Sequence, residues 1–340
     1  MAIVAATFVF LLPRIADYRD VWDVVQTLSW EWLAVFAGVV VLNLATFAPP
    51  WLVVLPKLRF FQAMELTQAS TALSLVLPAG TAAGVGVSFG MLQSWGLPRR
   101  EITRGLTLVS LWNQFLNLAF PIVAVFLLTA RGEETKLLAT AAFIGVAILG
   151  VVVAGFVLAL ASRRLANEVG EIAARLANWA LGKFRRGPVG WGGPSFERFR
   201  ASAGELLRRR WHVLTFFSLV GSLSVFLVLL VCLRALGVPA SEVSAVEAFA
   251  AWSLVRLLGS IPITPGGVGI IELGLTTALI GFGGNNAGVV AAVLVYRFLT
   301  MAPTLVYGLV AAGTWRRHRP PPESVPAPPV GAGVDSTLRR

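Results

Sequence analysis

The sequence predicts an all-α polytopic membrane protein, and three observations predict this class. Hydrophobic residues make up 56 % of the 340 residues and charged residues only 13 %, whereas soluble domains carry about 25 % charged residues. Several uncharged runs are long enough to cross the roughly 30 Å hydrocarbon core of a bilayer. Two of these runs are broken by proline and glycine. We therefore expect about six spans and two broken or re-entrant helical hairpins, arranged as an inverted repeat.

The N-terminal region is not expected to contain a full membrane span. Residues 1–12 are apolar but would reach only about 18 Å as a helix, which makes a partial span. Residues 14–31 place apolar side chains at helical spacing and include Trp22 and Trp30. Tryptophan is enriched at membrane–water boundaries, so this segment predicts a short interfacial helix.

The next part of the chain predicts two spans on either side of a broken segment. The spans are 32–55 and 106–130, and the broken segment is 63–96, which contains Pro78 and Gly80. Proline removes a backbone donor and disfavours a helical conformation in the residue before it, so we expect the helix to break there. Together these elements form the first repeat of the predicted architecture.

A further span is predicted at 137–161, followed by the strongly basic region 162–210. Apolar residues between positions 165 and 179 recur at steps of three and four, which predicts an amphipathic helix on the membrane surface. We expect this helix to end near Gly182. Because basic loops stay on the cytoplasmic side, region 162–210 is predicted to be cytoplasmic.

The last part of the chain repeats the first pattern. Spans are predicted at 212–236 and 287–315, with a broken segment at 243–283 between them. The single transmembrane domain would then cover 1–315, and the proline-rich tail 316–340 is expected to be disordered and cytoplasmic.

The charge distribution also predicts how the two groups are related. It places the N- and C-termini in the cytoplasm. One broken segment would then enter from the cytoplasm and the other from outside, which makes repeat one (32–130) and repeat two (212–315) inverted copies. Inverted repeats with broken helices at the midplane are a recurring transporter architecture.

Most of the residues that indicate a functional site lie at the second break. Pro265, Gly266, Gly267 and Gly269 interrupt the helix, and Glu272 follows them. We expect a half-helix beginning near Gly267, whose N-terminus would offer amides and a partial positive charge to an anion. The alternative is that the glycines permit close helix packing.

The stretch from Pro265 to Glu272, followed by Tyr296-Arg297, Pro303 and Gly308, resembles the signature of the lysylphosphatidylglycerol synthase transmembrane family, also called flippase-like domain proteins. The resemblance implies a multi-pass protein of a bacterial or archaeal cell inner membrane. Family members that aminoacylate lipid do so with a separate soluble domain after the membrane part. Only the short tail follows here, so we expect no enzymatic activity.

Three charged residues are the principal site candidates, because ionisable groups within a membrane are costly. Glu272 either contacts a headgroup or couples protons, or else it is a structural carboxylate paired with Arg297. Arg297 is then a counter-ion, a phosphate clamp or both in turn. Arg256 is a second phosphate candidate; the alternative is that it snorkels to the membrane surface.

Two asparagines complete the predicted binding set. Asn113 and Asn117 share one helical face, where they either join helices or contact substrate. In repeat one, Ser88 stands near the position that Glu272 occupies in repeat two. The second repeat is therefore expected to carry most of the chemistry.

These signals favour a translocase for a lipid or lipid-linked glycan with an anionic headgroup, such as an anionic phospholipid or a polyprenyl-linked glycan. The alternatives are an ion-coupled permease for a small anion, and a non-transporting membrane subunit that partners a glycosyltransferase or synthase. We expect no cofactor, metal or nucleic acid. The formal charge of +11 is explained by basic loops, and Cys232, His212 and His318 match no catalytic or metal spacing.

Overall fold

The structure is a computed structural model, and every regular element in the described part of the chain is a helix. The described residues are 26, 28–76, 80–131, 147, 149–151, 153–158, 162–183, 192–259 and 264–315. The helices are α4 (Trp30–Thr46), α5 (Pro49–Val54), α6 (Phe60–Val76), α7 (Gly80–Ser94), α8 (Arg99–Ala130), α10 (Arg163–Lys183), α11 (Gly193–Ala235), α12 (Ala245–Gly259), the 3₁₀ turn η2 (Pro265–Gly267), α13 (Ile270–Gly281) and α14 (Asn286–Thr314).

Four helical segments of the described chain are long and apolar enough to cross a membrane: Trp30–Val54, Arg99–Ala130, Leu206–Ala235 and Asn286–Ala311. A bent pair, Leu149–Leu158 with Arg163–Ile172, makes a fifth if it is counted as one span. The chain is therefore a multi-pass membrane protein. The predicted partial span at 1–12, most of the interfacial segment predicted at 14–31, most of the span predicted at 137–161, and the tail at 316–340 lie outside the described residues.

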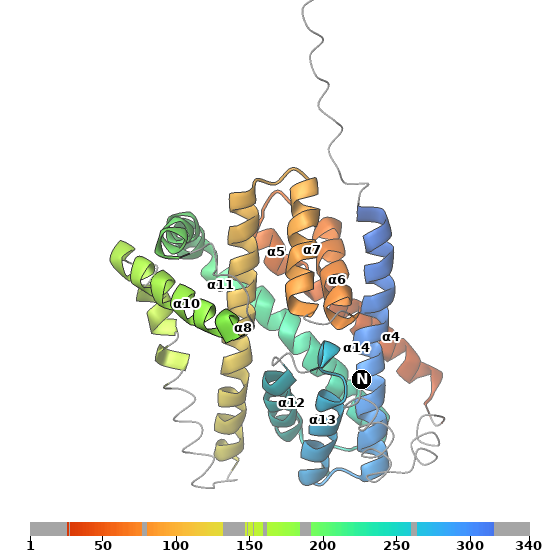
Figure 1. Cartoon of the computed structure of the whole chain (residues 1–340). Helices are drawn as coiled ribbons and strands as arrows, with labels where there is room; N and C mark the ends of the chain where they lie inside the picture. The colour runs from red at the N-terminus through yellow and green to blue at the C-terminus, as the bar shows by residue number, and fades with distance from the viewer. Residues whose placement is uncertain are drawn as a thin grey trace, which may run out of the picture.

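Both broken segments consist of two shorter helices, as the proline positions predicted. In the first, α6 ends at Val76 and α7 begins at Gly80; in the second, α12 ends at Gly259 and α13 begins at Ile270. Figure 1 shows α6 and α7 side by side in the upper half of the molecule and α12 and α13 in the lower half. Helices α8, α11 and α14 run through both halves, so they connect the two hairpins.

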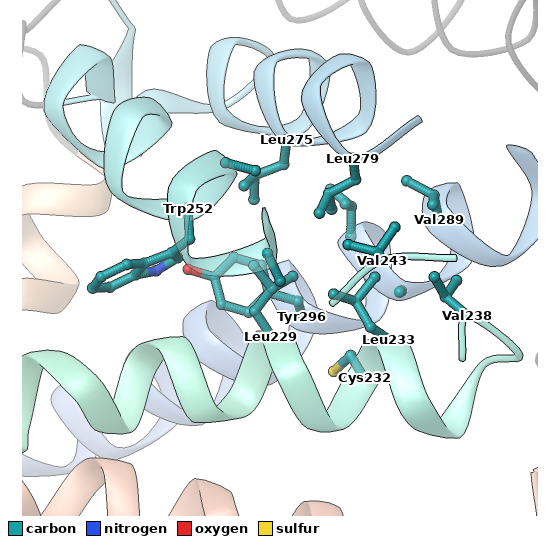
Figure 2. Packing of buried hydrophobic residues seen from close by; sticks show 14 of the residues in the cluster. Leu229, Cys232, Leu233, Val238, Val243, Trp252, Leu275, Leu279, Val289 and Tyr296 are labelled. Atoms are coloured by element: carbon teal, nitrogen blue, oxygen red, sulfur yellow. The ribbon is translucent and has the colours of Figure 1, made fainter. Parts of the chain in front are cut away.

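Two hydrophobic cores correspond to these halves. The first core contains residues from α5, α6, α7, α8 and the first part of α11. It buries Leu66, Leu92 and Leu108 fully. The second core joins the far ends of α8 and α11 to α12, α13 and the first part of α14. Figure 2 shows Trp252 and Tyr296 lying within this second core. Each hairpin is thus anchored at its base by a core of its own.

The basic region 162–210 contains more helix than a surface loop would. The predicted amphipathic helix is present as α10, which ends at Lys183, beside Gly182. It buries Ala174 and leaves Ile172 and Trp179 exposed, so an apolar edge remains outward. The backbone amide of Gly193 donates to the Glu171 carboxylate at 2.9 Å, which ties the start of α11 to α10.

The span predicted at 212–236 is the second part of a longer helix. Helix α11 begins at Gly193 and continues without a break to Ala235. Its arginine-rich stretch is flanked by residues that pack into the first core, such as Ala203 and Leu214. Helical geometry therefore extends through the basic stretch because one face of it has apolar neighbours to pack against.

Candidate functional site

The break between α12 and α13 is held in a conformation that requires glycine. Gly266, Gly267 and Gly269 have φ values of 62°, 66° and 88°, a region that residues with a Cβ rarely adopt. An α-helix cannot pass through such residues, so α13 begins at Ile270 and not near Gly267 as predicted. The three glycines are therefore required first for backbone conformation, beyond any role in helix packing.

Glu272 binds the N-terminus of its own helix. Its side chain is 2 % exposed, and one carboxylate oxygen accepts a hydrogen bond from the Gly269 amide at 2.7 Å. A carboxylate in the first turn offsets the partial positive charge of a helix N-terminus. In this conformation Glu272 itself occupies the position that the sequence predicted for an external anion.

Arg297 joins Glu272 to the break. The Arg297 Nε donates to the second carboxylate oxygen of Glu272 at 2.7 Å, and a terminal nitrogen donates to the Gly266 carbonyl at 2.8 Å. The pair is almost fully shielded, with side-chain exposures of 11 % for Arg297 and 2 % for Glu272. The predicted counter-ion contact is confirmed, and it fixes the loop to α14.

Arg256 has a different environment. Its Nε donates to the Asn117 amide oxygen at 2.7 Å, and its guanidinium lies 5.2 Å from the ring centre of Trp252. The side chain therefore turns toward α8 and does not snorkel to the surface. Both of these contacts are with neutral groups, so neither neutralises its charge.

Arg256 and Arg297 line one cavity of about 280 Å³, which we call the arginine cavity. Its polar lining also includes Asn117, Thr71 and Thr300, and its apolar lining includes side chains from α11, α12 and α13. An arginine forms bidentate hydrogen bonds with phosphate or carboxylate, so the arrangement suits an anion.

A second cavity of about 260 Å³ lies between α6, α7, α8 and α11, and we call it the hydroxyl cavity. Its polar lining residues are Thr67, Ser70, Thr71, Ser74, Ser88, Ser110, Asn113 and Ser218. From the sequence alone, only Ser88 and Asn113 of this set were singled out. The hydroxyl residues of α6 recur at steps of three and four, and this spacing is the sequence pattern that could have indicated the others.

The structure brings some of the predicted residues together and separates others. Gly266, Gly269, Glu272 and Arg297 are joined by direct hydrogen bonds, while Arg256 and Asn117 form a separate bonded pair that lines the same cavity as Arg297. Asn113 lines the other cavity. Within the described residues no three His, Cys, Asp or Glu side chains lie close enough to hold a metal ion.

The sequence matches a known protein family over most of its length. Residues 1–308 match the sequence model of the lysylphosphatidylglycerol synthase TM region. The chain belongs to this family. Membership in the lysylphosphatidylglycerol synthase TM family indicates a membrane protein that handles lipid. No curated protein matches the chain as a relative.

The residues that resembled the family signature now have structural roles. Besides the glycines and the ion pair, Gly308 lets α14 approach α6, because a Cβ there would meet the side chain of Ala72 and the carbonyl of Gln68. Small residues at helix contacts are typical of membrane proteins. Tyr296 is buried in the second core, which holds Arg297 beside the break.

Proposed function

We propose that this chain translocates an anionic lipid or lipid-linked glycan between the leaflets of a bacterial or archaeal cell inner membrane. The observation that carries the proposal is Arg256, a cation whose two described contacts are neutral and which lines a cavity among helices that cross or enter the membrane. The headgroup would bind there while the acyl or isoprenoid chains stay in the bilayer.

The two arginines of the cavity have unequal roles in this proposal. Arg297 is paired with Glu272, so together they add no net charge. Arg256 supplies the net positive charge, and a phosphate would replace Asn117 as its partner with a stronger, charge-assisted hydrogen bond. Arg256 is therefore the anion ligand, and the ion pair holds the break in place.

The two hairpins support a transport cycle. A Cβ at Gly266 would lie 2.8 Å from the Leu75 side chain, so the second break touches the end of α6. We infer that the hairpins form an inverted repeat, entering the membrane from opposite sides, with both termini and region 162–210 in the cytoplasm. Rocking of one repeat against the other would open the arginine cavity to each leaflet in turn. No covalent step belongs to this activity.

The test is lipid movement in proteoliposomes. Purified protein would be reconstituted with fluorescent phosphatidylglycerol, phosphatidylcholine or a polyprenyl-phosphate sugar, and the label on the outer leaflet would be followed by quenching. We expect movement of the anionic lipids, reduced at least ten-fold by Arg256→Gln. Arg131→Gln is the matched control, because Arg131 is exposed at the end of α8.

Two outcomes would overturn the proposal. One is equal rates for Arg256→Gln and the wild type, which would remove Arg256 from the transport path. The other is no movement of any lipid by folded protein above empty vesicles. In that case a small soluble anion, or a structural role beside a membrane enzyme, becomes the better account of the same cavity.

A further inference from the structure

The hydroxyl cavity differs from the arginine cavity in the chemistry that it offers. Among the described residues that line it there is no Asp, Glu, Lys or Arg, and their polar groups are hydroxyls and one amide. Phe47 and Trp51 add aromatic surface at its edge. Such a lining suits a neutral group that makes several hydrogen bonds.

The hydroxyls on α6 are arranged to accept hydrogen bonds. Thr67 donates to the Ala63 carbonyl at 2.8 Å, Ser70 to the Thr67 carbonyl at 3.0 Å and Ser74 to the Ser70 carbonyl at 2.8 Å. A hydroxyl has one proton and two lone pairs, so each oxygen can still accept. The helix therefore presents a row of acceptors to a ligand rich in O–H donors.

Ser218 supplies the second, independent observation. It lies on α11, lines the hydroxyl cavity and is 4 % exposed. Its hydroxyl oxygen is buried and has no hydrogen-bond partner in the described part of the chain. An unsatisfied buried polar group is costly in a native structure, and because Ser218 also lines the cavity, a ligand bound there would satisfy it.

The two cavities are neighbours along the same helices. Thr71 lines both of them. On α8, Asn113 lines the hydroxyl cavity and Asn117, one turn later, lines the arginine cavity. A phosphate at Arg256 would therefore carry a directly attached group toward the hydroxyls.

We propose that the hydroxyl cavity binds a neutral polyhydroxylated group, a sugar or a glycerol unit, attached to the phosphate that Arg256 holds. This inference rests on the proposed function and narrows its substrate to polyol phosphates. An ammonium headgroup is disfavoured there, because no carboxylate lines the cavity to offset its desolvation. The nearby charge of Arg256 opposes a second cation as well.

Binding to the purified full chain in detergent tests the inference. The probes are a hexose 1-phosphate, glycerol 3-phosphate and inorganic phosphate, titrated calorimetrically. We expect the better of the two polyol phosphates to bind at least ten-fold tighter than inorganic phosphate, and its identity separates sugar from glycerol. Ser218→Ala should bring the ratio of polyol-phosphate affinity to inorganic-phosphate affinity close to one, while leaving the affinity for inorganic phosphate unchanged.

A matched control lies one turn along α11. Ser222 is also buried, at 1 % exposed, and its oxygen also has no partner in the described residues, but it lines neither cavity. Ser222→Ala should leave the ratio as in the wild type. Neither alanine variant should lower the melting temperature, since each removes an unsatisfied hydroxyl, so a lost ratio cannot be ascribed to unfolding.

The result separates this inference from the translocase proposal. Equal affinity for all three probes, or an equal effect of both serine variants, overturns the polyol site even if lipids move. A polyol preference that depends on Ser218, in protein that moves no lipid, keeps the site and overturns translocation. The ligand would then be a soluble phosphate ester.

Discussion

Both hairpins consist of two short helices, yet the polar side chains that they supply differ. The α12–α13 hairpin brings Glu272 and Arg256 to its break, and α14 adds Arg297. The α6–α7 hairpin brings hydroxyl groups, and Ser88 is one of them. The comparison teaches that an architecture with two similar halves need not contain two copies of its site. One hairpin supplies charge and the other supplies neutral hydrogen-bonding surface.

The forces that hold the two hairpins also differ. The second is fixed by a shielded ion pair, whose Arg297 donates to the Gly266 carbonyl and whose Glu272 accepts from the Gly269 amide. The first is fixed by close packing, since a Cβ at Gly84 would meet Ser74 and Ser70 on the facing helix. Removing one charge should therefore be more damaging than removing one hydroxyl.

The largest effect is expected from Arg297→Gln. This change leaves the Glu272 carboxylate buried without its counter-ion, and breaking one side of a buried pair typically costs about 3–5 kcal/mol. We expect little folded protein in detergent, measured as the monodisperse fraction in size-exclusion chromatography and by thermal unfolding.

The double variant Glu272→Gln/Arg297→Gln is the control for this prediction. It removes both charges and should recover more than half of the lost stability, because no uncompensated charge remains. A double variant as unstable as Arg297→Gln would show that the pair acts through shape or hydrogen bonding alone.

A smaller effect is expected from Gly266→Ala, with Gly86→Ala as its partner in the other hairpin. At Gly266 a Cβ must adopt a left-handed φ and approach Leu75, which costs about 1–2 kcal/mol. At Gly86, inside α7, a Cβ meets nothing within 4 Å, and alanine favours the helix by about 0.5–1 kcal/mol. The melting temperature should therefore fall in Gly266→Ala and rise in Gly86→Ala. Destabilisation by both would contradict the difference in backbone requirement between Gly266 and Gly86.

The smallest effect on stability is expected from replacing an asparagine of α8, and the two asparagines should differ in their effect on phosphate binding. Asn117→Ala removes the hydrogen bond to Arg256, and such contacts between membrane helices contribute about 0.6 kcal/mol on average. We expect a small fall in melting temperature and tighter phosphate binding, because the phosphate no longer has to displace Asn117 from Arg256. Asn113→Ala should leave phosphate binding unchanged, since Asn113 lines the other cavity. Equal changes of phosphate affinity in the two variants would contradict the division into two cavities.

Local signals in the sequence predicted the parts of the site that depend on a few adjacent residues. The proline and glycine pattern predicted the break, and the cost of charge in a membrane made the pairing of Glu272 with Arg297 one of the two alternatives for these residues. The start of α13 at Ile270 was missed, because the left-handed conformations follow from the packing around the glycines. The partner of Arg256 was missed for a related reason, because Asn117 is 139 residues away in the chain and no local pattern connects them.

The carboxylate of Glu272 has one more consequence. By sitting on the Gly269 amide it acts as a built-in competitor for any anion that approaches the start of α13. Because this competitor is part of the chain, its effective concentration at the site is high and never diluted. A phosphate can hold that amide only by displacing it, so the anion remains weakly held there and can leave as readily as it arrives. For the translocase that we propose, such a balance would keep the cargo from being trapped halfway across the bilayer.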